Sequence, residues 1–277
     1  MSTGLLGFES VQERQGGVRE YISPSRLNCW LSCPLKWFFR YIEGIRTPTT
    51  PALFVGKACH AGLEVYYRHR QLGVTLGVDD VMRRMAESWA ALVDEEKMDF
   101  DSTDDEAAMR QQVANLVRVY LDNVPKDEKP LAVEVAAEAP LVDPDTGEDL
   151  GIPLVGVIDL VLNNEAGPII TDFKTAARSS EPMEITNEIQ LSSYAWLHRQ
   201  ITGQHEGGLE IRSLIKTKVP KTEFHPYPAR TEVHFARLLA VIREYLDALD
   251  AGKFNFRPGF SCGMCDFRCT HCSRWAG

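Results

Sequence analysis

The feature that most constrains the fold is a change of pattern near residue 130. From that point the chain carries three segments rich in Val and Ile, separated by the turn-forming stretches DPDTGED and NEAG. The three segments are residues 131–142, 153–164 and 168–176. Short β-branched segments joined by such turns predict an antiparallel meander of three strands.

The rest of the chain is predominantly helical in pattern. Residues 23–44, SPSRLNCWLSCPLKWFFRYIEG, predict one helix, because Ser23 or Ser25 can cap its start and Gly44 can end it. Further helices are predicted at residues 55–73, 78–98, 104–123, 187–202 and 231–250, and a strand at 209–218. Helices, a meander, then helix, strand and helix predict an α/β domain with a mixed sheet at its centre.

The composition is that of a soluble globular protein, with 44% hydrophobic and 25% charged residues. We expect a cytoplasmic protein with no membrane span, because neither a signal peptide nor a long apolar run is visible. The net charge is −9, but residues 79–150 alone hold 20 acidic and 7 basic residues, which leaves 19 acidic against 23 basic elsewhere, or +4. The simplest interpretation of the acidic segment is a solvated face, and the remainder is compatible with a phosphate-binding surface.

The third strand segment carries an unusual pair of charges. Side chains alternate between the faces of a strand, so Asp172 and Lys174 share one face while Phe173 takes the other. Taken alone, this pair also fits a structural salt bridge at a sheet edge. Asp159, however, lies about as far before the NEAG turn as Asp172 lies after it, so the two carboxylates should be neighbours. Their repulsion is most simply relieved by a divalent cation such as Mg²⁺.

The pattern GVIDLV…IITDFKT resembles the signature of the PD-(D/E)xK nuclease superfamily. The context resembles its RecB-like branch, which includes the AddB nuclease domain and the CRISPR-associated adaptation nucleases. A G-x-x-x-H element lies upstream, from Gly56 to His60, and a Q-x-x-x-Y element follows at Gln190 and Tyr194. These elements stand in the family's order over residues 23–272. The resemblance implies a restriction-endonuclease-like core, with a central mixed sheet flanked by helices.

The resemblance also implies roles for individual residues. Its metal site, for Mg²⁺ or Mn²⁺, would be formed by His60, Asp159, Asp172 and the Phe173 carbonyl. Lys174 would be the catalytic lysine, and Gln190 and Tyr194, one helical turn apart, would hold that lysine or the scissile phosphate. Outside this context His60 is typical of an ordinary helix histidine, and Gln190 and Tyr194 of an amphipathic helix. Two further acids fit either a supporting role or the surface: Glu64 and Glu134.

Seven cysteines gather near the two ends of the chain, and clustered C-x-x-C spacing in a cytosolic protein favours metal over disulfides. Two sites fit: a zinc knuckle of the last four cysteines, or a [4Fe–4S] cluster joining Cys33 to three of them. The W-x-x-C-P-x-x-W-x-x-x-Y stretch around Cys33 resembles iron–sulfur members of the branch, and this implies the cluster. Its ligands would be Cys33, Cys262, Cys265 and Cys272, with Cys269 as the alternative for the last, although the family's usual spacing points to His271. Such a cluster would staple the first helix to the chain end.

We therefore expect a metal-dependent exonuclease that acts on single-stranded or frayed DNA ends, in CRISPR spacer acquisition or in recombination and repair. Lys36 and Arg40, in a run of aromatic residues, could contact the DNA. No GxxxxGK[ST] motif is present, so unwinding would need a helicase partner, and spacer acquisition an integrase. The alternatives are an inactive DNA-binding protein on the same fold and a zinc-knuckle interaction protein. The expected organisation is a polar leader at 1–22, a helical region at 23–130, a nuclease core at 131–256 and a cysteine-rich tail at 257–277.

Overall fold

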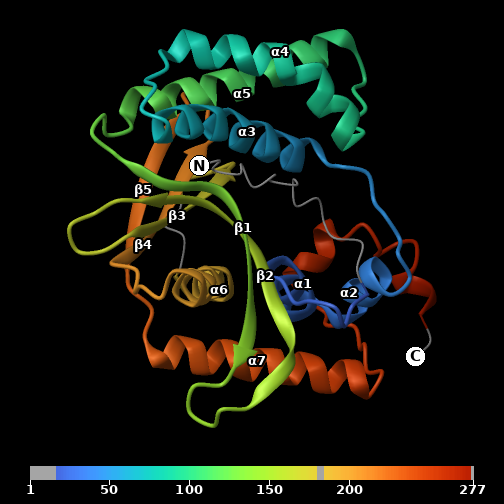
Figure 1. The fold of residues 1–277 in the computed structure, drawn as a ribbon. Helices are drawn as coiled ribbons and strands as arrows, with labels where there is room; N and C mark the ends of the chain where they lie inside the picture. Colours follow the sequence, from blue (N-terminus) through green and yellow to red (C-terminus); the bar gives the residue numbers. More distant parts are fainter. Residues whose placement is uncertain (1–16, 180–183, 276–277) are drawn as a thin grey trace, which may run out of the picture.

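A five-stranded sheet forms the centre of the protein (Figure 1). The computed structural model describes residues 17–179 and 184–275. In spatial order the strands are β1 (Pro130–Val142), β2 (Asp149–Leu162), β3 (Ile169–Ala176), β4 (Gly208–Ile215) and β5 (Lys221–Pro228). β3 and β4 run parallel, and the other neighbours run antiparallel. The predicted meander is therefore present, and the mixed α/β class is confirmed.

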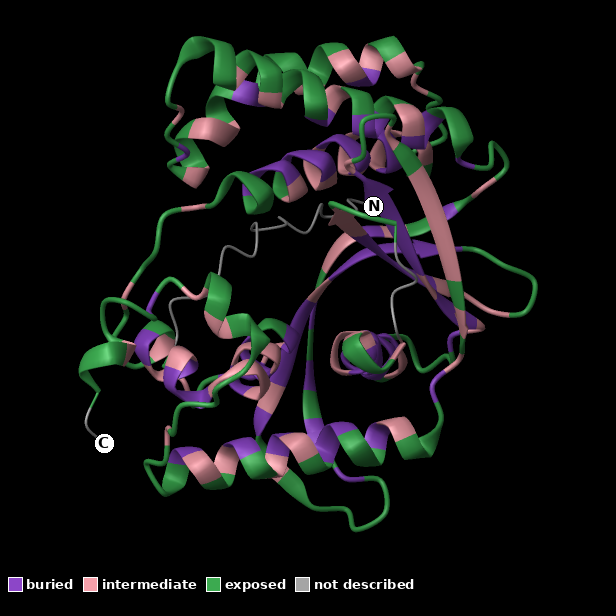
Figure 2. Ribbon diagram, turned by 180° about the vertical axis from the view of Figure 1, so that it is seen from behind, coloured by how far each residue is buried: buried purple, intermediate pink, exposed green. Residues whose placement is uncertain are grey.

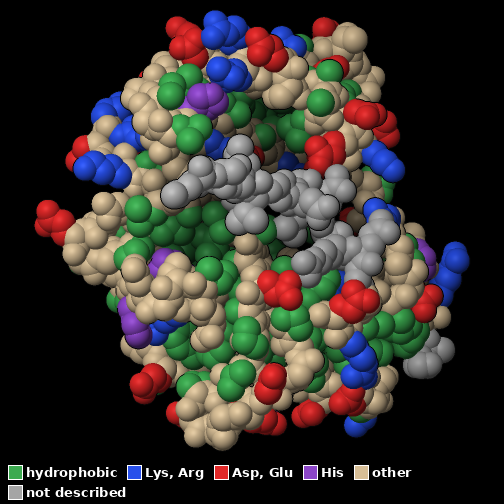
Figure 3. Space-filling model, in the orientation of Figure 1, with side chains coloured by type: hydrophobic (Ala, Val, Ile, Leu, Met, Phe, Trp, Pro, Cys, Tyr) green, Lys and Arg blue, Asp and Glu red, His purple; other side chains and the backbone are tan. Residues whose placement is uncertain are grey.

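Helices cover both faces of this sheet. They are α1 (Pro24–Ser32), α2 (Pro34–Tyr41), α3 (Pro51–Gln71), α4 (Val78–Glu96), α5 (Thr103–Asn123), α6 (Glu184–Thr202) and α7 (Glu232–Asp250). α3 and α5 pack on one face with α4 outside them, while α6 packs on the other face and contacts α1 and α7 (Figure 1). Acidic and basic side chains are mixed over the outer helical layer in Figure 3. Each helix in Figure 2 turns buried residues inward.

The alternation of side chains along β3 divides the core into two parts. Ile170 belongs to the cluster on the α6 side, whereas Phe173 belongs to the cluster under α3 and α5. The Phe173 ring lies 6.0 Å from the ring of Tyr67, nearly parallel to it, and 5.7 Å from the ring of Tyr120, edge to face. Asp172, between these two core positions, therefore faces α6.

The single helix predicted for residues 23–44 is wrong. α1 ends at Ser32 and α2 begins at Pro34, and Cys33 between them is extended, with φ −166° and ψ 113°. Proline has no backbone N–H, and its ring disfavours helical backbone at the preceding residue. The predicted cap is present, since the Arg26 N–H donates to Ser23 Oγ at 3.3 Å. Cys33 consequently stands at a corner between two helices.

The sequence pattern did not predict β5. Its sequence, KTEFHPYP, has few β-branched residues and contains two prolines. It nevertheless pairs with β4 along its whole length and lies at one edge of the sheet. An edge strand tolerates proline because one side of its backbone has no neighbouring strand to bond.

The predicted polar leader, residues 1–22, lies mostly outside the described residues, which begin at residue 17. Its last residue, Ile22, is fully buried and bridges to Leu154 of β2. The end of the leader therefore enters the core. Within residues 17–179 and 184–275, no helix combines the length and the apolar character that crossing a membrane requires.

A buried ionic network joins the α3–α5 layer to the sheet. Arg212 of β4 donates to the hydroxyls of Tyr67 and Tyr120 at 3.0 and 2.8 Å. The same guanidinium forms ion pairs with Glu128 at 2.7 Å and Glu210 at 2.6 Å. Its side chain is only 4% exposed, so these partners replace the water that a charged group otherwise requires.

Removing this arginine should destabilise the fold strongly. Arg212→Met leaves Glu128 without its cation in a mostly buried position, so we expect the free energy of unfolding to fall by about 3–5 kcal/mol. Urea denaturation measures this loss. Arg118→Met is the control, because its pair with Asp79 is exposed and should contribute about 1 kcal/mol or less. Similar losses in both variants would contradict a special role for the buried network.

Candidate active site

The candidate site begins where β2 and β3 separate. These strands pair only next to their shared turn, from Leu160 to Leu162 on β2. The next residues away from the turn are Asp159 on β2 and Asp172 on β3, and both are buried. Asp159 Oδ2 accepts a hydrogen bond at 2.8 Å from the backbone N–H of Phe173, in place of a strand partner. The end of the ladder thus places two buried carboxylates at the opening between β2 and β3.

α3 closes one side of this opening with His60. Its Nε2 donates to the Phe173 carbonyl oxygen at 3.0 Å. Its Nδ1 faces Asp159 Oδ2 at 3.6 Å and Glu134 Oε1 at 3.8 Å. Ligand atoms of His60, Glu134 and Asp159 all lie within 4.8 Å of one another, which is a spacing that one metal ion can span. An imidazole with carboxylate and carbonyl oxygens is a donor set that fits Mg²⁺ or Mn²⁺.

Glu134 is the site residue that the sequence left undecided. The pairing of Val133 with Leu160 and of Val135 with Ile158 places it opposite Asp159. Its φ of +46° is left-handed, which is rare for a residue with a side chain and costs about 1–3 kcal/mol. Such strain persists where the surroundings require it, and it clusters at functional sites. Counting from the middle of the DPDTGED turn would have revealed Glu134, because it precedes that turn by about as many residues as Asp159 follows it.

The electrostatics show an excess of negative charge. Burial raises the pKa of Asp159, and the nearby carboxylates of Asp172 and Glu134 raise it further, against the opposing effect of His60. Burial alone would lower the pKa of His60, but the carboxylates of Asp159 and Glu134 outweigh it and raise that pKa. His60 and Lys174 thus face three carboxylates, those of Glu134, Asp159 and Asp172. A divalent cation would supply the missing positive charge.

The second half of the site joins β3 to α6. Lys174 Nζ lies 2.8 Å from Asp172 Oδ2 and donates to Gln190 Oε1 at 2.7 Å. The Gln190 amide nitrogen donates to Asp172 Oδ1 at 2.8 Å and to the Tyr194 hydroxyl at 2.9 Å. Asp172 Oδ2 is buried and has an ion pair but no hydrogen bond, so it retains the capacity for another ligand.

Two of the predicted site residues, Asp172 and Glu64, lie outside the compact candidate metal-binding group. Asp172 stands apart from the compact set of His60, Glu134 and Asp159, since its oxygens are engaged by Lys174 and Gln190. Glu64 lies outside both groups and pairs with Arg68 on the surface of α3, at 2.6 Å.

Two glycines let the helices approach the strands. At Gly156 of β2 a Cβ would lie 2.9 Å from Leu197 Cδ1, so a larger residue would force the Leu197 side chain of α6 to move. At Gly56 of α3 a Cβ would lie 3.3 Å from Thr175 Oγ1, immediately beyond Lys174. Both glycines belong to the sequence elements around Asp159 and His60. Glycine at these two positions allows α6 and α3 to pack closely against the strands.

The two ends of the chain meet in a cluster of thiols. Cys33, Cys265 and Cys272 pack against the same small core, formed by Leu35, Phe39 and Phe267. Burial raises the pKa of Cys272, and nearby thiols raise it further, namely those of Cys33, Cys265 and Cys262. Cys269, by contrast, is exposed. The tail therefore lies beside α1 and α2, as Figure 1 shows.

The distances between these sulfur atoms can be compared with those in a tetrahedral zinc site. Zinc binds thiolates at about 2.3 Å, so a tetrahedral site would bring the sulfurs to about 3.8 Å from one another. Among the residues that the structure describes, no three cysteine sulfurs lie within 4.8 Å of one another. The thiols thus gather beside one another without forming a compact tetrahedral set.

Comparison with known proteins identifies the family. A protein-family model described as the PD-(D/E)XK nuclease superfamily matches residues 21–270. The chain belongs to this superfamily. The family expected from the sequence is therefore confirmed, and membership of the PD-(D/E)XK nucleases supports a metal-dependent nuclease. Among curated proteins, none matches the chain.

One solved structure shares the fold of this PD-(D/E)XK protein. The crystal structure of a candidate exonuclease from Eubacterium rectale aligns with a TM-score of 0.58 at 14% identity, covering 97% of this chain and 94% of that chain. At this identity the likeness shows a shared fold. The crystal structure of SSO0001 aligns with a TM-score of only 0.44 at 12% identity, covering 96% of this chain and 89% of that chain.

Metal binding should be measurable without any substrate. A cation that binds the folded state stabilises it, by about 2.7 kcal/mol at a hundredfold excess over its Kd. We expect Mn²⁺ to raise the free energy of unfolding of the wild-type protein, and Glu134→Gln and Asp159→Asn to lose most of that gain. Urea denaturation with and without MnCl₂ measures it. Glu64→Gln is the matched control and should keep the full gain, whereas an undiminished gain in Glu134→Gln would exclude Glu134 from the metal site.

Proposed function

We propose that the protein is a metal-dependent deoxyribonuclease that removes nucleotides from single-stranded or frayed DNA ends. The observation that carries this proposal is the Asp172–Lys174 pair, bridged by Gln190, beside the compact group of His60, Glu134 and Asp159. The description of the Eubacterium rectale structure as a candidate exonuclease supports the choice of DNA ends. The resemblance adds a partner: an integrase in CRISPR spacer acquisition, or a helicase in recombination and repair.

The ligands for Mg²⁺ or Mn²⁺ would come from His60, Glu134, Asp159, Asp172 and the Phe173 carbonyl. When bound, the cation supplies positive charge that polarises the phosphate and acidifies water. Lys174 is the member of the charged pair that substrate can reach, because its side chain is 36% exposed and that of Asp172 only 2%. Its ammonium would neutralise the charge that develops on the phosphate.

α6 holds this lysine in place. The Gln190 amide nitrogen has two acceptors, Asp172 and the Tyr194 hydroxyl, so its carbonyl oxygen must face Lys174. Three hydrogen bonds thereby fix the orientation of the amide. Lys174 then keeps one hydrogen bond and one ion pair and has donor capacity left for a phosphate oxygen.

Cleavage tests this proposal directly. Lys174→Ala and Asp172→Asn should each lower the rate at which end-labelled single-stranded DNA is shortened in Mg²⁺ or Mn²⁺ by about 10²-fold or more, because each removes a charge next to the reacting phosphate. Arg83→Ala is the control, since Arg83 only pairs with Asp80 on the exposed surface of α4. Absence of metal-dependent cleavage in the wild-type protein, or full activity in Lys174→Ala, would contradict the assignment.

We also propose that the thiol cluster holds a [4Fe–4S] group through Cys33, Cys262, Cys265 and Cys272. Support comes from the convergence of these four thiols and from the exposure of Cys269. The group would tie the corner between α1 and α2 to the chain end. A link between residues so distant in sequence restricts the unfolded chain and so stabilises the fold.

Metal analysis of anaerobically purified protein checks this assignment. The wild-type protein should contain about four iron atoms and four acid-labile sulfides per chain. Cys33→Ser should lose both, because Cys33 is the one ligand outside the tail. Cys269→Ser should keep both, since its thiol lies away from the cluster. Stoichiometric zinc in place of iron would favour the zinc-knuckle alternative instead.

A further inference from the structure

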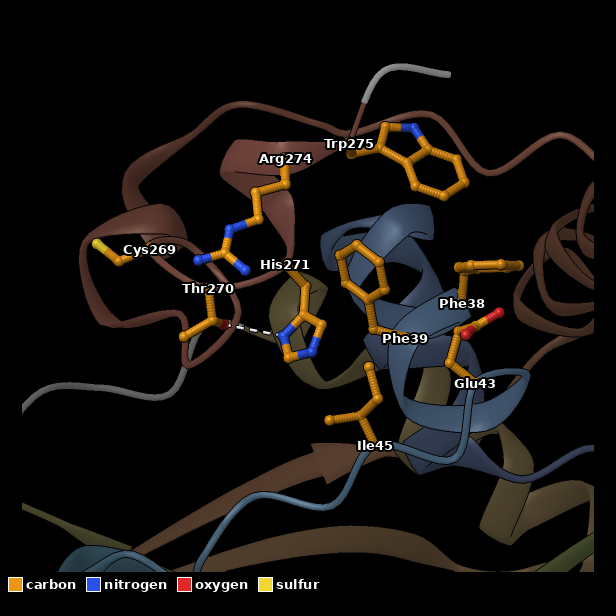
Figure 4. A pocket seen from close by; sticks show the side chains of 9 residues that line it. All are labelled: Phe38, Phe39, Glu43, Ile45, Cys269, Thr270, His271, Arg274 and Trp275. Carbon is orange, nitrogen blue, oxygen red and sulfur yellow. Dashed lines mark hydrogen bonds between the residues drawn. The ribbon is translucent and has the colours of Figure 1, made fainter.

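A hollow of about 440 Å³ lies between the end of α2 and the tail of the chain (Figure 4). Its walls combine aromatic rings with charged side chains, and those used below are Phe38, Phe39, Glu43, His271, Arg274 and Trp275. The volume falls in the range of about 300–1,000 Å³ that is usual for small-molecule sites. None of these residues belongs to the candidate active site.

The aromatic wall is arranged to receive a flat ligand. The Trp275 ring stands nearly perpendicular to the ring of Phe39, at 5.9 Å, and His271 lies 5.5 Å from Phe39. Phe39 is buried and forms the floor, whereas Trp275 remains 37% exposed. The exposed indole and the exposed imidazole lie on either side of Phe39 (Figure 4), and each offers a ring face on which another ring can stack.

The electrostatic surroundings favour an anionic ligand. Residues 30–46 and 253–275, which supply α2 and the tail, hold seven Lys or Arg against two Asp or Glu, a formal charge of +5 in a chain of −9. At the hollow itself, Arg274 has no ion pair with any residue that the structure describes. Its guanidinium lies on the same side of the hollow as His271 (Figure 4). Glu43 is the one carboxylate in the wall, and it can accept a hydrogen bond from an amino group.

We propose that this hollow binds one nucleobase of single-stranded DNA, stacked on Trp275, with Arg274 against an adjoining phosphate. Aromatic faces beside positive charge are the usual means of binding single strands without sequence preference. The inference rests on the proposed function and deepens it. It assigns the tail a direct contact with substrate, at a place separate from the candidate active site.

The test is a binding measurement that needs no cleavage. Fluorescence anisotropy with a labelled single-stranded oligonucleotide, without added divalent metal, gives the Kd of a Lys174→Ala chain. Adding Trp275→Ala should weaken binding about 5- to 100-fold, since stacking on one aromatic side chain contributes that much. Trp275→Phe should keep most of the affinity. Phe256→Ala is the matched control, because Phe256 is 60% exposed immediately before the tail but does not line the hollow.

A second oligonucleotide, with abasic sites in place of its bases, separates stacking from phosphate binding. On this probe Trp275→Ala should have no further effect, whereas Arg274→Ala should weaken binding to both probes. Unchanged binding of the natural oligonucleotide by Trp275→Ala overturns the proposal. An equal loss on both probes overturns it as well, because that loss would not depend on the base.

The two proposals can fail separately. If the wild-type protein shortens DNA and Trp275→Ala leaves binding unchanged, the hollow is wrongly assigned and the nuclease proposal stands. If the wild-type protein binds single strands through Trp275 but shows no metal-dependent cleavage, the hollow stands and the nuclease proposal falls. Iron content and the circular dichroism spectrum of Trp275→Ala, compared with those of Trp275→Phe, show whether the tail is still folded.

Discussion

The candidate site depends on one hydrogen bond, from the backbone N–H of Phe173 to the carboxylate of Asp159. It forms where a regular ladder between β2 and β3 would otherwise continue. The strands separate at that point, and a side chain supplies the acceptor that a buried N–H requires. Without this replacement the two strands would either stay paired, leaving no opening, or leave a donor unsatisfied. The same Asp159 carboxylate therefore both completes the hydrogen bonding of the sheet and contributes to the candidate site.

Much of this arrangement was predictable because it follows from short-range rules. Alternation along a strand puts Asp172 and Lys174 on one face, and helical spacing places Gln190 and Tyr194 on one side of α6. The order of the meander follows from its turns. Glu134 was harder to place, because its position depends on the register across a longer hairpin and on a left-handed backbone that residue type does not predict.

Other features depend on contacts between distant parts of the chain. β5 forms because β4 offers it a partner along its whole length, although its own residues are poor strand formers. The break at Cys33 was visible in Pro34, yet the helical pattern on both sides concealed it. The hollow beside Trp275 could not be predicted, since its two walls come from opposite ends of the sequence.

Phe173 has a consequence for how such a protein can change over time. Its backbone N–H donates to Asp159 and its carbonyl accepts from His60, and no substitution at this position except proline removes either group. Its ring, packed against Tyr67 and Tyr120, connects those backbone atoms to the core under α3 and α5. Neutral drift in the core under α3 and α5 would therefore shift the position of two polar atoms at the centre of the site. Core residues outside the candidate site thus help to set the distance between the Asp159 carboxylate and the His60 imidazole.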